Sequence, residues 1–594
     1  VANYSAADIP LDTMWGDIDY MDVYKDFTWD PVNYPVDQVQ NFTAQLHDQH
    51  QQYVVILDPG IKYNDTSYTP FNELVQNGGY IYDVSGDPFV GQVWPGYTIF
   101  PDFMNSDGQN YWSEQLDTLL QTVPYDGLWV DMNEISNFCS GECTDGAPVP
   151  PSSTTCGCTS SSKSEAFYAQ FTRDEAIMLY DDGDSFDPEN PPYAINNNEN
   201  HNPLNNKALD VNAYHYNEDG GIISEYDCHN LYGLTEARQT HIALKDYYSE
   251  RPFVLTRSSF PSSGRWTAHW TGDNASQWAD LYYSIVGMLN FNILGIPMIG
   301  SDICGFLDNT TEELCSRWIE VGSFYPFSRN HDTTGVAPQE LYRWPTVSAI
   351  SSFILRVRYS VIPMYYTLNY RASTQGSPII RPLFFEFPTD ANTLAIDRQF
   401  LVGSSLMVAP VLDQGATSVD AYFPAAVWYD FYNYTQFVST GESKTLNAPL
   451  DFIPLYILGG SIIPRRTNPG LTTYETRMNP FNITVAFDSS MKASGELFTD
   501  NGRTVDFETD SNLVTFSANY SNSKGFLQST IVQNNYDSSF SNAISSIAFL
   551  GVPAAPQGVS VNGASWGAFS FSNGVLSITN LTLDVTSAFE IQFS

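Results

Sequence analysis

Basic residues are scarce in this sequence. Its 594 residues include 25 lysines and arginines against 67 aspartates and glutamates, which gives a formal net charge of −42 at pH 7. Nucleic acids and anionic membranes are negatively charged and would be repelled, so neither is expected as a partner. An acidic surface also keeps a protein soluble when its carboxylates begin to take up protons. We therefore expect function at mildly acid pH.

Several familiar signatures are also missing. No run of about 18 apolar residues occurs, which argues against a membrane-spanning helix. The sequence has no H-E-x-x-H motif, no phosphate-binding glycine-rich loop and no G-x-S-x-G motif, and its eight histidines are scattered. We therefore expect no metal, no cofactor and no serine-hydrolase mechanism.

Cysteines are few and unevenly placed. Four of the seven crowd a stretch rich in proline, serine and threonine between residues 139 and 158. Their C-x3-C and C-x-C spacing suits zinc poorly, so we expect two local disulfides of unknown connectivity. Cys304 and Cys315 are close enough to bridge one loop. Cys228 is left over, either as a buried free thiol or as a thiol that pairs with another chain.

Secretion is indicated by glycosylation sequons rather than by a signal peptide, because the chain starts in mature-looking sequence. The N-x-S/T sequons lie at Asn3, Asn41, Asn64, Asn274, Asn309, Asn433, Asn482, Asn519 and Asn580. This density favours an N-glycosylated extracellular protein. Asn274 is an exception, since a glycan there would obstruct the candidate site described below.

The pattern from residue 12 to about residue 376 predicts β/α units, because strand-like runs that end in polar residues alternate with amphipathic helical stretches. The helical stretches include residues 112–122, 277–291 and 347–372. Seven candidate barrel strands end near Asp17, Asp58, Asp131, Arg257, Asp273, Asp302 and His331. A closed barrel needs an eighth strand, and the residues before Asp12 cannot hold a strand and a helix. We expect a (β/α)8 TIM barrel that lacks its first strand in this chain.

The remaining boundaries are predicted from changes in residue pattern along the chain. Residues 136–235 form an insertion in the barrel domain, which occupies residues 1–376. After Ser377, short alternating segments are broken by glycine, proline and asparagine, which is typical of β-sandwiches. We expect a proximal sandwich at 377–465 and a distal one at 466–594. The predicted fold class is therefore α/β plus all-β.

Two strand ends deliver carboxylates. Apolar residues from Gly127 lead into Asp131 and Glu134, and a second segment leads through His269-Trp-Thr-Gly to Asp273. Such a pair is typical of glycoside hydrolysis, which needs one carboxylate to attack the anomeric carbon or activate water and one acid to protonate the leaving oxygen. The alternative is that Asp131 and Glu134 cap the next helix or face solvent.

Four motifs carry a resemblance to a known family. They are W-V-D-M-N-E at 129–134, H-W-T-G-D-N at 269–274, G-S-D-I-C-G-F at 300–306 and F-Y-P-F-S-R-N-H at 324–331. In this order they closely resemble the α-glucosidases of glycoside hydrolase family 31, from Asp12 through the β-rich C-terminal region. The overall character is that of a secreted fungal enzyme.

The resemblance implies roles for the polar residues. Asp131 would be the nucleophile of a retaining mechanism and Asp273 the acid/base, with their carboxyl groups roughly 5–5.5 Å apart. Asp17, Arg257 and His331 would hold the hydroxyls of the terminal glucose. Arg257 could instead form a salt bridge at the barrel mouth, and His331 could be a core histidine.

The resemblance also supplies a pocket. Asp302 and Phe306 match further pocket positions, although Asp302 could instead hold Arg257. The apolar walls would be formed by Trp15, Ile18, Ile61, Trp94, Trp129, Met132, Trp270 and Phe306. Any single tryptophan is more often a core residue than a platform for sugar.

The implied enzyme is an exo-acting α-glucosidase that needs no cofactor. Its substrates would be α-1,4-linked gluco-oligosaccharides, with α-1,6 links as a further option, and transfer to sugar acceptors is expected. Family members commonly carry the Cys304–Cys315 disulfide, and they have a β-sandwich and the first barrel strand ahead of this region. We therefore expect a tightly bound N-terminal chain from the same precursor. Two alternatives are an α-glucan lyase and a non-catalytic glycan-binding subunit.

Overall fold

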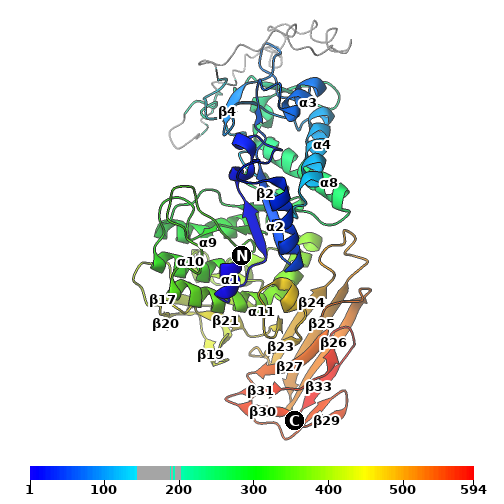
Figure 1. The fold of residues 1–594 in the computed structure, drawn as a ribbon. Helices are drawn as coiled ribbons and strands as arrows, with labels where there is room; N and C mark the ends of the chain where they lie inside the picture. Colours follow the sequence, from blue (N-terminus) through cyan, green and yellow to red (C-terminus); the bar gives the residue numbers. More distant parts are fainter. Residues whose placement is uncertain (144–187, 189–190, 194, 196–201) are drawn as a thin grey trace. The chain divides into compact units, whose positions relative to one another are not determined.

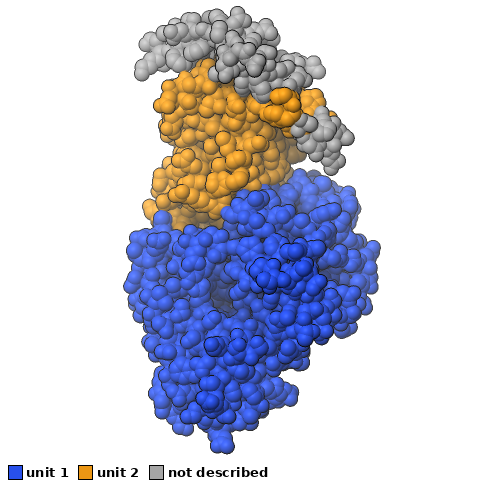
Figure 2. All heavy atoms as spheres, turned by 180° about the vertical axis from the view of Figure 1, so that it is seen from behind, with its two compact units in different colours: residues 1–12, 268–594 blue, residues 13–267 orange. Residues whose placement is uncertain are grey.

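The computed structural model describes residues 1–143, 188, 191–193, 195 and 202–594. Within these residues the chain forms two compact units. Unit 1 comprises residues 1–12 and 268–594, and unit 2 comprises residues 13–267 (Figure 2). Most of the predicted insertion at 136–235, including Cys156 and Cys158, lies outside the described residues.

Unit 2 is built on parallel strands. The strands β1 (Thr13–Gly16), β2 (Gln52–Leu57), β6 (Gly127–Val130) and β9 (Phe253–Thr256) pair in that order. β2 and β6 are buried along almost their whole length, as expected of strands covered on both faces. The main helices of this unit are α2 (Val36–Asp48), α3 (Thr69–Asn77), α4 (Ser106–Thr122) and α8 (Tyr232–Tyr248). Helix α2 lies beside β2 (Figure 1).

Local sequence explains where α4 begins. The side chain of Asn105 accepts hydrogen bonds from the backbone N–H groups of Asp107 and Gly108, which satisfies donors that would otherwise have no partner. Gly108 is required because an added Cβ would lie 2.0 Å from the carbonyl oxygen of Asp102. The start of α4 is therefore fixed against the segment that carries Asp102.

Antiparallel ribbons complete unit 2. The strands β3 (Ile61–Lys62), β5 (Gly96–Ile99) and β4 (Gly91–Val93) form one small sheet. A second ribbon pairs β7 (Tyr214–Tyr216) with β8 (Ile222–Ser224), and it runs directly into α7 (Glu225–Cys228) and the short helix η4 (His229–Leu231). These last elements belong to the described part of the predicted insertion.

Unit 1 continues the parallel pattern and then changes to antiparallel sheets. β10 (Ala268–Trp270) pairs with β11 (Ile299–Gly300), and β12 (Asp302–Ile303) pairs with β13 (Arg329–Asn330). The helices between and after them are α9 (Trp278–Ile293), α10 (Glu312–Gly322) and α11 (Pro345–Gln375) (Figure 1). The seven strand ends and the three helical stretches expected from the sequence therefore match observed elements, with His331 directly after β13 and Asp302 opening β12.

The first antiparallel group has two sheets, ordered β14-β15-β16-β21-β18-β19 and β17-β20. Its strands are β14 (Ile380–Arg381), β15 (Phe400–Val402), β16 (Leu406–Val408), β17 (Ser418–Phe423), β18 (Ala426–Asp430), β19 (Gln436–Ser439), β20 (Glu442–Asn447) and β21 (Leu455–Leu458). A core of buried aromatic and aliphatic side chains lies between them.

The second group holds the last strands of the chain, shown in orange and red in Figure 1. Its sheets are ordered β22-β23-β27-β31-β30, with β32 beside β27, and β24-β25-β26-β33-β28-β29. The strands are β22 (Ile462–Arg466), β23 (Phe481–Ala486), β24 (Lys492–Thr499), β25 (Asn512–Ser521), β26 (Lys524–Asn534), β27 (Ala543–Leu550), β28 (Val559–Val561), β29 (Ala564–Trp566), β30 (Phe569–Ser572), β31 (Val575–Ile578), β32 (Leu583–Asp584) and β33 (Glu590–Phe593). Side chains from both sheets share one core, as in a sandwich.

The predicted boundary between the two β regions falls inside a strand. Residue 465 lies within β22, which pairs with β23 of the second group. The change from one group to the other therefore comes before β22. The α/β plus all-β fold class is confirmed.

Disulfides and the free thiol are also placed. Cys304 is bonded to Cys315, as the resemblance implied, and Cys139 is bonded to Cys143. Cys228 is a buried free thiol. No helix among the described residues has the length and hydropathy needed to cross a membrane.

Candidate active site

The carboxyl ends of the unit 2 strands bring polar side chains to one edge. Leu57 is paired with Val130, and Val130 with Thr256. The next residue on each strand, namely Asp58, Asp131 or Arg257, therefore stands at the same level. Within unit 2, the ends of β2, β6 and β9 therefore lie together, as the sequence predicted.

Arg257 joins the two carboxylates of the W-V-D-M-N-E motif. Its Nε lies 3.1 Å from Oδ1 of Asp131 and donates to Oε1 of Glu134 at 2.8 Å. Its Nη2 donates to the other oxygen of Glu134 at 2.9 Å and to the hydroxyl of Ser136 at 2.9 Å. Asp131 is only 9% exposed. Arg257 thus forms the predicted salt bridge, and that bridge includes the candidate nucleophile.

The charge of Arg257 also acts on Glu134. Burial tends to raise the pKa of this carboxyl group. The hydrogen bonds and charge of Arg257, together with the hydroxyl of Ser136, outweigh burial and hold the pKa of Glu134 below its usual value. Glu134 is therefore an anion that fixes the guanidinium, and it does not act as a helix cap.

Asn133 fastens the turn after Asp131. Its Nδ2 donates to Oγ1 of Thr256 at 2.9 Å, and its Oδ1 accepts from the backbone N–H of Ser258 at 2.8 Å. Met132 adopts a positive φ of 55°, which is uncommon outside glycine. The nucleophile turn is thus held to the end of β9 by buried side-chain bonds.

A second pair of acids lies behind this edge. The backbone N–H of Asp58 donates to Oδ1 of Asp26 at 2.8 Å, and both side chains are buried. Burial raises the pKa of each well above its usual range; for Asp58 the charges of Asp26 and Asp131 raise it further, against Arg257. Both carboxyl groups therefore favour the neutral form more strongly than an exposed carboxyl group would.

The apolar residues of unit 2 that were predicted to line the sugar pocket differ in solvent exposure. Trp15 meets Trp129 edge to face, with ring centroids 6.0 Å apart. Trp129 and Met132 are buried at the strand end, and Ile61 has no exposed surface, because it packs in a hydrophobic cluster. By contrast, Trp94 is 46% exposed and meets the equally exposed Phe138 edge to face.

Two further predicted residues of unit 2 lie at its first strand. Asp17 follows β1, and its carboxylate accepts a hydrogen bond from the backbone N–H of Ile18 at 2.7 Å. Both side chains are half-buried. Asp17 thus lies near the surface at the end of β1.

In unit 1, Asp302 and Arg329 form a buried pair. Oδ1 of Asp302 accepts from Nη2 of Arg329 at 2.6 Å and from Nε at 3.1 Å. The guanidinium lies over the rings of Trp270 and Phe327. Within unit 1 the guanidinium partner of Asp302 is Arg329, which the register of β12 and β13 places directly opposite. Arg257 belongs to unit 2, so the alternative that Asp302 holds Arg257 stays a prediction.

His331 and Phe306 lie together beside this pair. Their rings stack with centroids 5.2 Å apart and planes 24° apart. Nε2 of Gln339 donates to the carbonyl oxygens of Gly305 and His331 at 2.9 and 3.1 Å, which ties the two segments together. His331 is half-buried rather than a core histidine.

Asp273 follows β10 in unit 1 and is exposed. The neighbouring Asn274 donates from Nδ2 to Oγ of Ser301 at 2.9 Å and to the carbonyl oxygen of Asp302 at 3.0 Å. A glycan would replace one of the two hydrogens on this nitrogen, so at least one of these bonds would be lost, which agrees with treating its sequon as an exception. Asp131 belongs to unit 2, so the expected carboxyl separation stays a prediction.

Sequence reasoning missed three groups. Arg329 was present in a quoted motif, two residues before His331, so an alternating strand would have placed both on one side. Glu134 was expected at the strand end, with a helix cap or a solvent-exposed position as the alternative, and its role as the anchor of Arg257 was missed. Asp26 carries no motif, and nothing in the sequence indicated that it lies against Asp58.

Comparison with known proteins gives consistent results. Residues 1–368 match the model of the glycosyl hydrolases family 31 TIM-barrel domain, and residues 376–463 match that family's C-terminal domain. A probable alpha-glucosidase of Oryza sativa subsp. japonica is 42% identical over 614 residues, covering 100% of this chain and 64% of the rice protein. Alpha-xylosidase 1 of Arabidopsis thaliana is 40% identical and covers 95% and 60%.

Solved structures agree on the fold. The Tris-bound crystal structure of a glucosidase II alpha subunit matches with a TM-score of 0.83 at 27% identity, covering 100% of this chain and 59% of that one. The chain thus spans about two thirds or less of the length of these relatives.

Proposed function

Because the chain belongs to glycosyl hydrolase family 31, we propose that it is a retaining, exo-acting α-glucosidase. Its substrates are maltose and α-1,4-linked gluco-oligosaccharides, with α-1,6 links as a further option. The observation that carries this proposal is the buried carboxylate of Asp131 at the end of β6, held 3.1 Å from the guanidinium of Arg257. A cation at that distance favours the ionised carboxylate that an attacking nucleophile needs.

The proposed reaction has two steps. A carboxylate oxygen of Asp131 bonds to the anomeric carbon while the glycosidic C–O bond breaks, and Asp273 gives its proton to the leaving oxygen. Water then attacks the anomeric carbon and gives a proton to Asp273 while the bond from that carbon to the carboxylate oxygen of Asp131 breaks, which frees α-glucose and Asp131. A sugar hydroxyl in place of water would give transglucosylation. No cofactor enters either step.

The hydroxyl-binding roles rest on chemistry at each position. Oδ2 of Asp302 is buried and has no hydrogen-bond partner within the described residues, and such an atom is costly unless a ligand satisfies it. A sugar hydroxyl can do so. Asp17, Arg257 and His331 would hold other hydroxyls of the same ring through charge-assisted bonds.

The proposal extends to location and partner. The sequons support a secreted glycoprotein, and the greater length of the relatives supports an N-terminal chain of the same precursor. Limited unfolding of the purified protein and mass spectrometry of every chain present would test the partner. A single, fully active chain would contradict it.

The activity is tested by following glucose release from maltose by proton NMR. We expect the α-anomer first, and no release by Asp131→Ala, whose side chain lacks the nucleophile. Release of xylose from an α-xyloside, with no release from maltose, would favour an α-xylosidase, the activity in the name of the Arabidopsis relative. An unsaturated sugar would indicate a lyase, and binding without turnover would indicate a glycan-binding subunit.

A further inference from the structure

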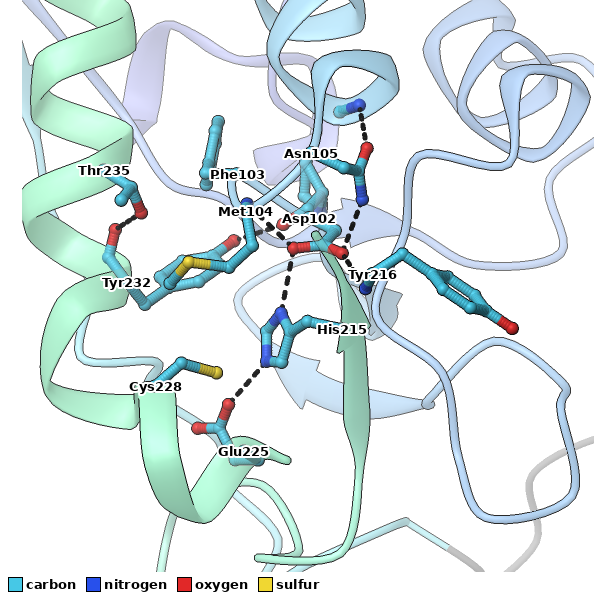
Figure 3. Close-up of polar contacts among 12 residues, drawn as sticks. Asp102, Phe103, Met104, Asn105, His215, Tyr216, Glu225, Cys228, Tyr232 and Thr235 are labelled. Carbon is cyan, nitrogen blue, oxygen red and sulfur yellow. Dashed lines mark hydrogen bonds and ion pairs between the residues drawn. The ribbon is translucent and has the colours of Figure 1, made fainter. Parts of the chain in front are cut away.

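A chain of four titratable groups, three of them buried, lies outside the candidate site, in unit 2. His215 on β7 has no exposed surface, and its two ring nitrogens face carboxylates on either side (Figure 3). Nδ1 lies 2.9 Å from Oδ1 of Asp102, and Nε2 lies 2.8 Å from Oε2 of Glu225. The other oxygen of Glu225 lies 2.7 Å from Nδ1 of His229. The order is therefore Asp102, His215, Glu225 and His229.

The contacts require a doubly protonated ring on His215. Asp102 also accepts from the backbone N–H of Met104 at 2.9 Å, from Nδ2 of Asn105 at 2.6 Å and from the backbone N–H of Tyr216 at 3.1 Å. The oxygens of Asp102 thus already act as acceptors toward three donors besides His215. Nδ1 of His215 therefore faces an acceptor and carries a proton. Nε2 faces Glu225, whose pKa is lowered because the hydrogen bonds of His215 and His229 outweigh burial, so Nε2 carries a proton as well. Burial acts against this charge, but Asp102, followed by Cys228 and Glu225, outweighs burial and raises the pKa of His215 well above its usual value.

The spacing of His215, Glu225 and Cys228 suits hydrogen bonds better than the coordination of a metal ion. His215, Glu225 and Cys228 offer ligand atoms within 4.8 Å of one another. Ligands at zinc distances in a tetrahedron stand at least about 3.3 Å apart, whereas Nε2 and Oε2 are 2.8 Å apart. The thiol of Cys228 is directed to the carbonyl oxygen of Ser224, at 3.2 Å, and burial, the largest influence, raises its pKa.

The cluster is connected mechanically to the nucleophile turn. Glu225 and His229 lie in α7 and η4, which lead directly into α8. At the start of α8, the hydroxyl of Tyr232 donates to the carbonyl oxygen of Pro101 at 2.8 Å. The next residue, Gly233, is so close to the turn that an added Cβ would lie 2.8 Å from the carbonyl oxygen of Asn133 and 2.5 Å from Cβ of Ser258.

We propose that His215 is a positioning residue: its doubly protonated ring clamps α7 to the Asp102 segment and so holds α8 against Asn133 and Ser258, beside Asp131 and Arg257. The clamp works only while the imidazolium is present. The groups that face it are Asp102, Glu225 and Cys228, with His229 beyond Glu225. Loss of one proton from His215 leaves a carboxylate facing a bare nitrogen and loosens the segment.

The kinetic test of this inference rests on the proposed glucosidase activity. In Glu225→Gln, the ring keeps Asp102 but loses one anionic partner, so the proton is held less tightly. We expect kcat/KM within about 3-fold of the wild type at pH 5, and an alkaline limb of the pH profile displaced downward by about one pH unit or more. The control is His47→Gln, which removes an exposed histidine facing Asp126 and should leave the limb in place.

A second measurement needs no substrate and so separates failure of the clamp from failure of the proposed function. Hydrogen exchange of the wild-type protein, corrected for the intrinsic effect of pH, should accelerate in residues 213–233 across the alkaline limb. It also decides the matter if Glu225→Gln does not fold. Unchanged exchange, coincident limbs in wild type and variant, or stoichiometric zinc that Cys228→Ala removes would each overturn the inference.

Discussion

The buried pair in unit 1 allows a stability prediction with a worked magnitude. Asp302 and Arg329 are almost wholly inaccessible, and Oδ1 of Asp302 accepts from Nη2 of Arg329 at 2.6 Å. Asp302→Ala removes one member and leaves a buried guanidinium without its carboxylate. Breaking such a pair costs about 3–5 kcal/mol in the free energy of unfolding. We expect a loss of this size in urea denaturation followed by tryptophan fluorescence.

The double variant Asp302→Ala with Arg329→Met gives the sharper test. Methionine keeps apolar contact with Trp270 and removes the uncompensated charge, so the double variant should be about 1–3 kcal/mol more stable than Asp302→Ala alone. Asp413→Ala breaks an exposed pair with Arg398 and should cost less than about 1 kcal/mol. The reasoning is refuted if the losses of Asp302→Ala and of Arg329→Met, each measured alone, add up to the loss of the double variant. It is also refuted if Asp302→Ala costs no more than the exposed control.

Three further changes have expected outcomes. Glu134→Gln weakens the anchor of the guanidinium shared with Asp131, and we expect kcat/KM on maltose to fall about 10–100-fold, since charged hydrogen bonds contribute roughly 1.5–3 kcal/mol. Asp58→Asn removes a carboxyl group whose folded-state pKa is raised; its unfolding free energy should decline less steeply than that of the wild type as pH rises above about 4, because only the native acid keeps a proton that the unfolded chain releases. Replacing Cys304 and Cys315 by alanine opens a loop with a sequence separation of 11 and should cost about 2–3 kcal/mol, measured by urea unfolding.

The strand ends could be predicted because their cause is local. An apolar run followed by a polar residue marks a buried parallel strand and its mouth, and the predicted ends at Asp17, Asp58, Asp131 and Arg257 coincide with the ends of observed strands. The boundary between the β regions could not be located equally well. β22 belongs to the second group because it pairs with β23, and pairing of separate strands is not written in either segment alone.

The sequence predicted which residues belong to the candidate site better than it predicted which of them contact one another. Asp131 and Arg257 could be expected together, because both follow strands of one parallel sheet. The partner of Asp302 could not, since an acid can pair with any base that the fold brings near, and the opposing residue proved to be Arg329. The proximity of Asp26 to Asp58 likewise depends on a long-range fold.

The buried titratable groups agree on the pH at which the protein should be most stable. Burial raises the pKa values of Asp26, Asp58 and Glu236 well above their usual range, so the folded chain keeps protons that the unfolded chain releases, and stability falls as pH rises. The contribution of His215 has the same sign: it is present below the unfolded pKa of about 6.5 and is lost as pH rises through the raised folded value. Glu225 opposes them, because hydrogen bonds from the two histidines outweigh burial and lower its pKa. Its contribution to stability is present above about pH 4.5 and is lost as pH falls through the folded value.

The opposing contributions to stability balance in the mildly acid range, where the excess of carboxylates also led us to expect function. Urea unfolding between pH 4 and 8 should therefore give a maximum below pH 7, and a maximum above it would contradict the protonation states assigned to these groups.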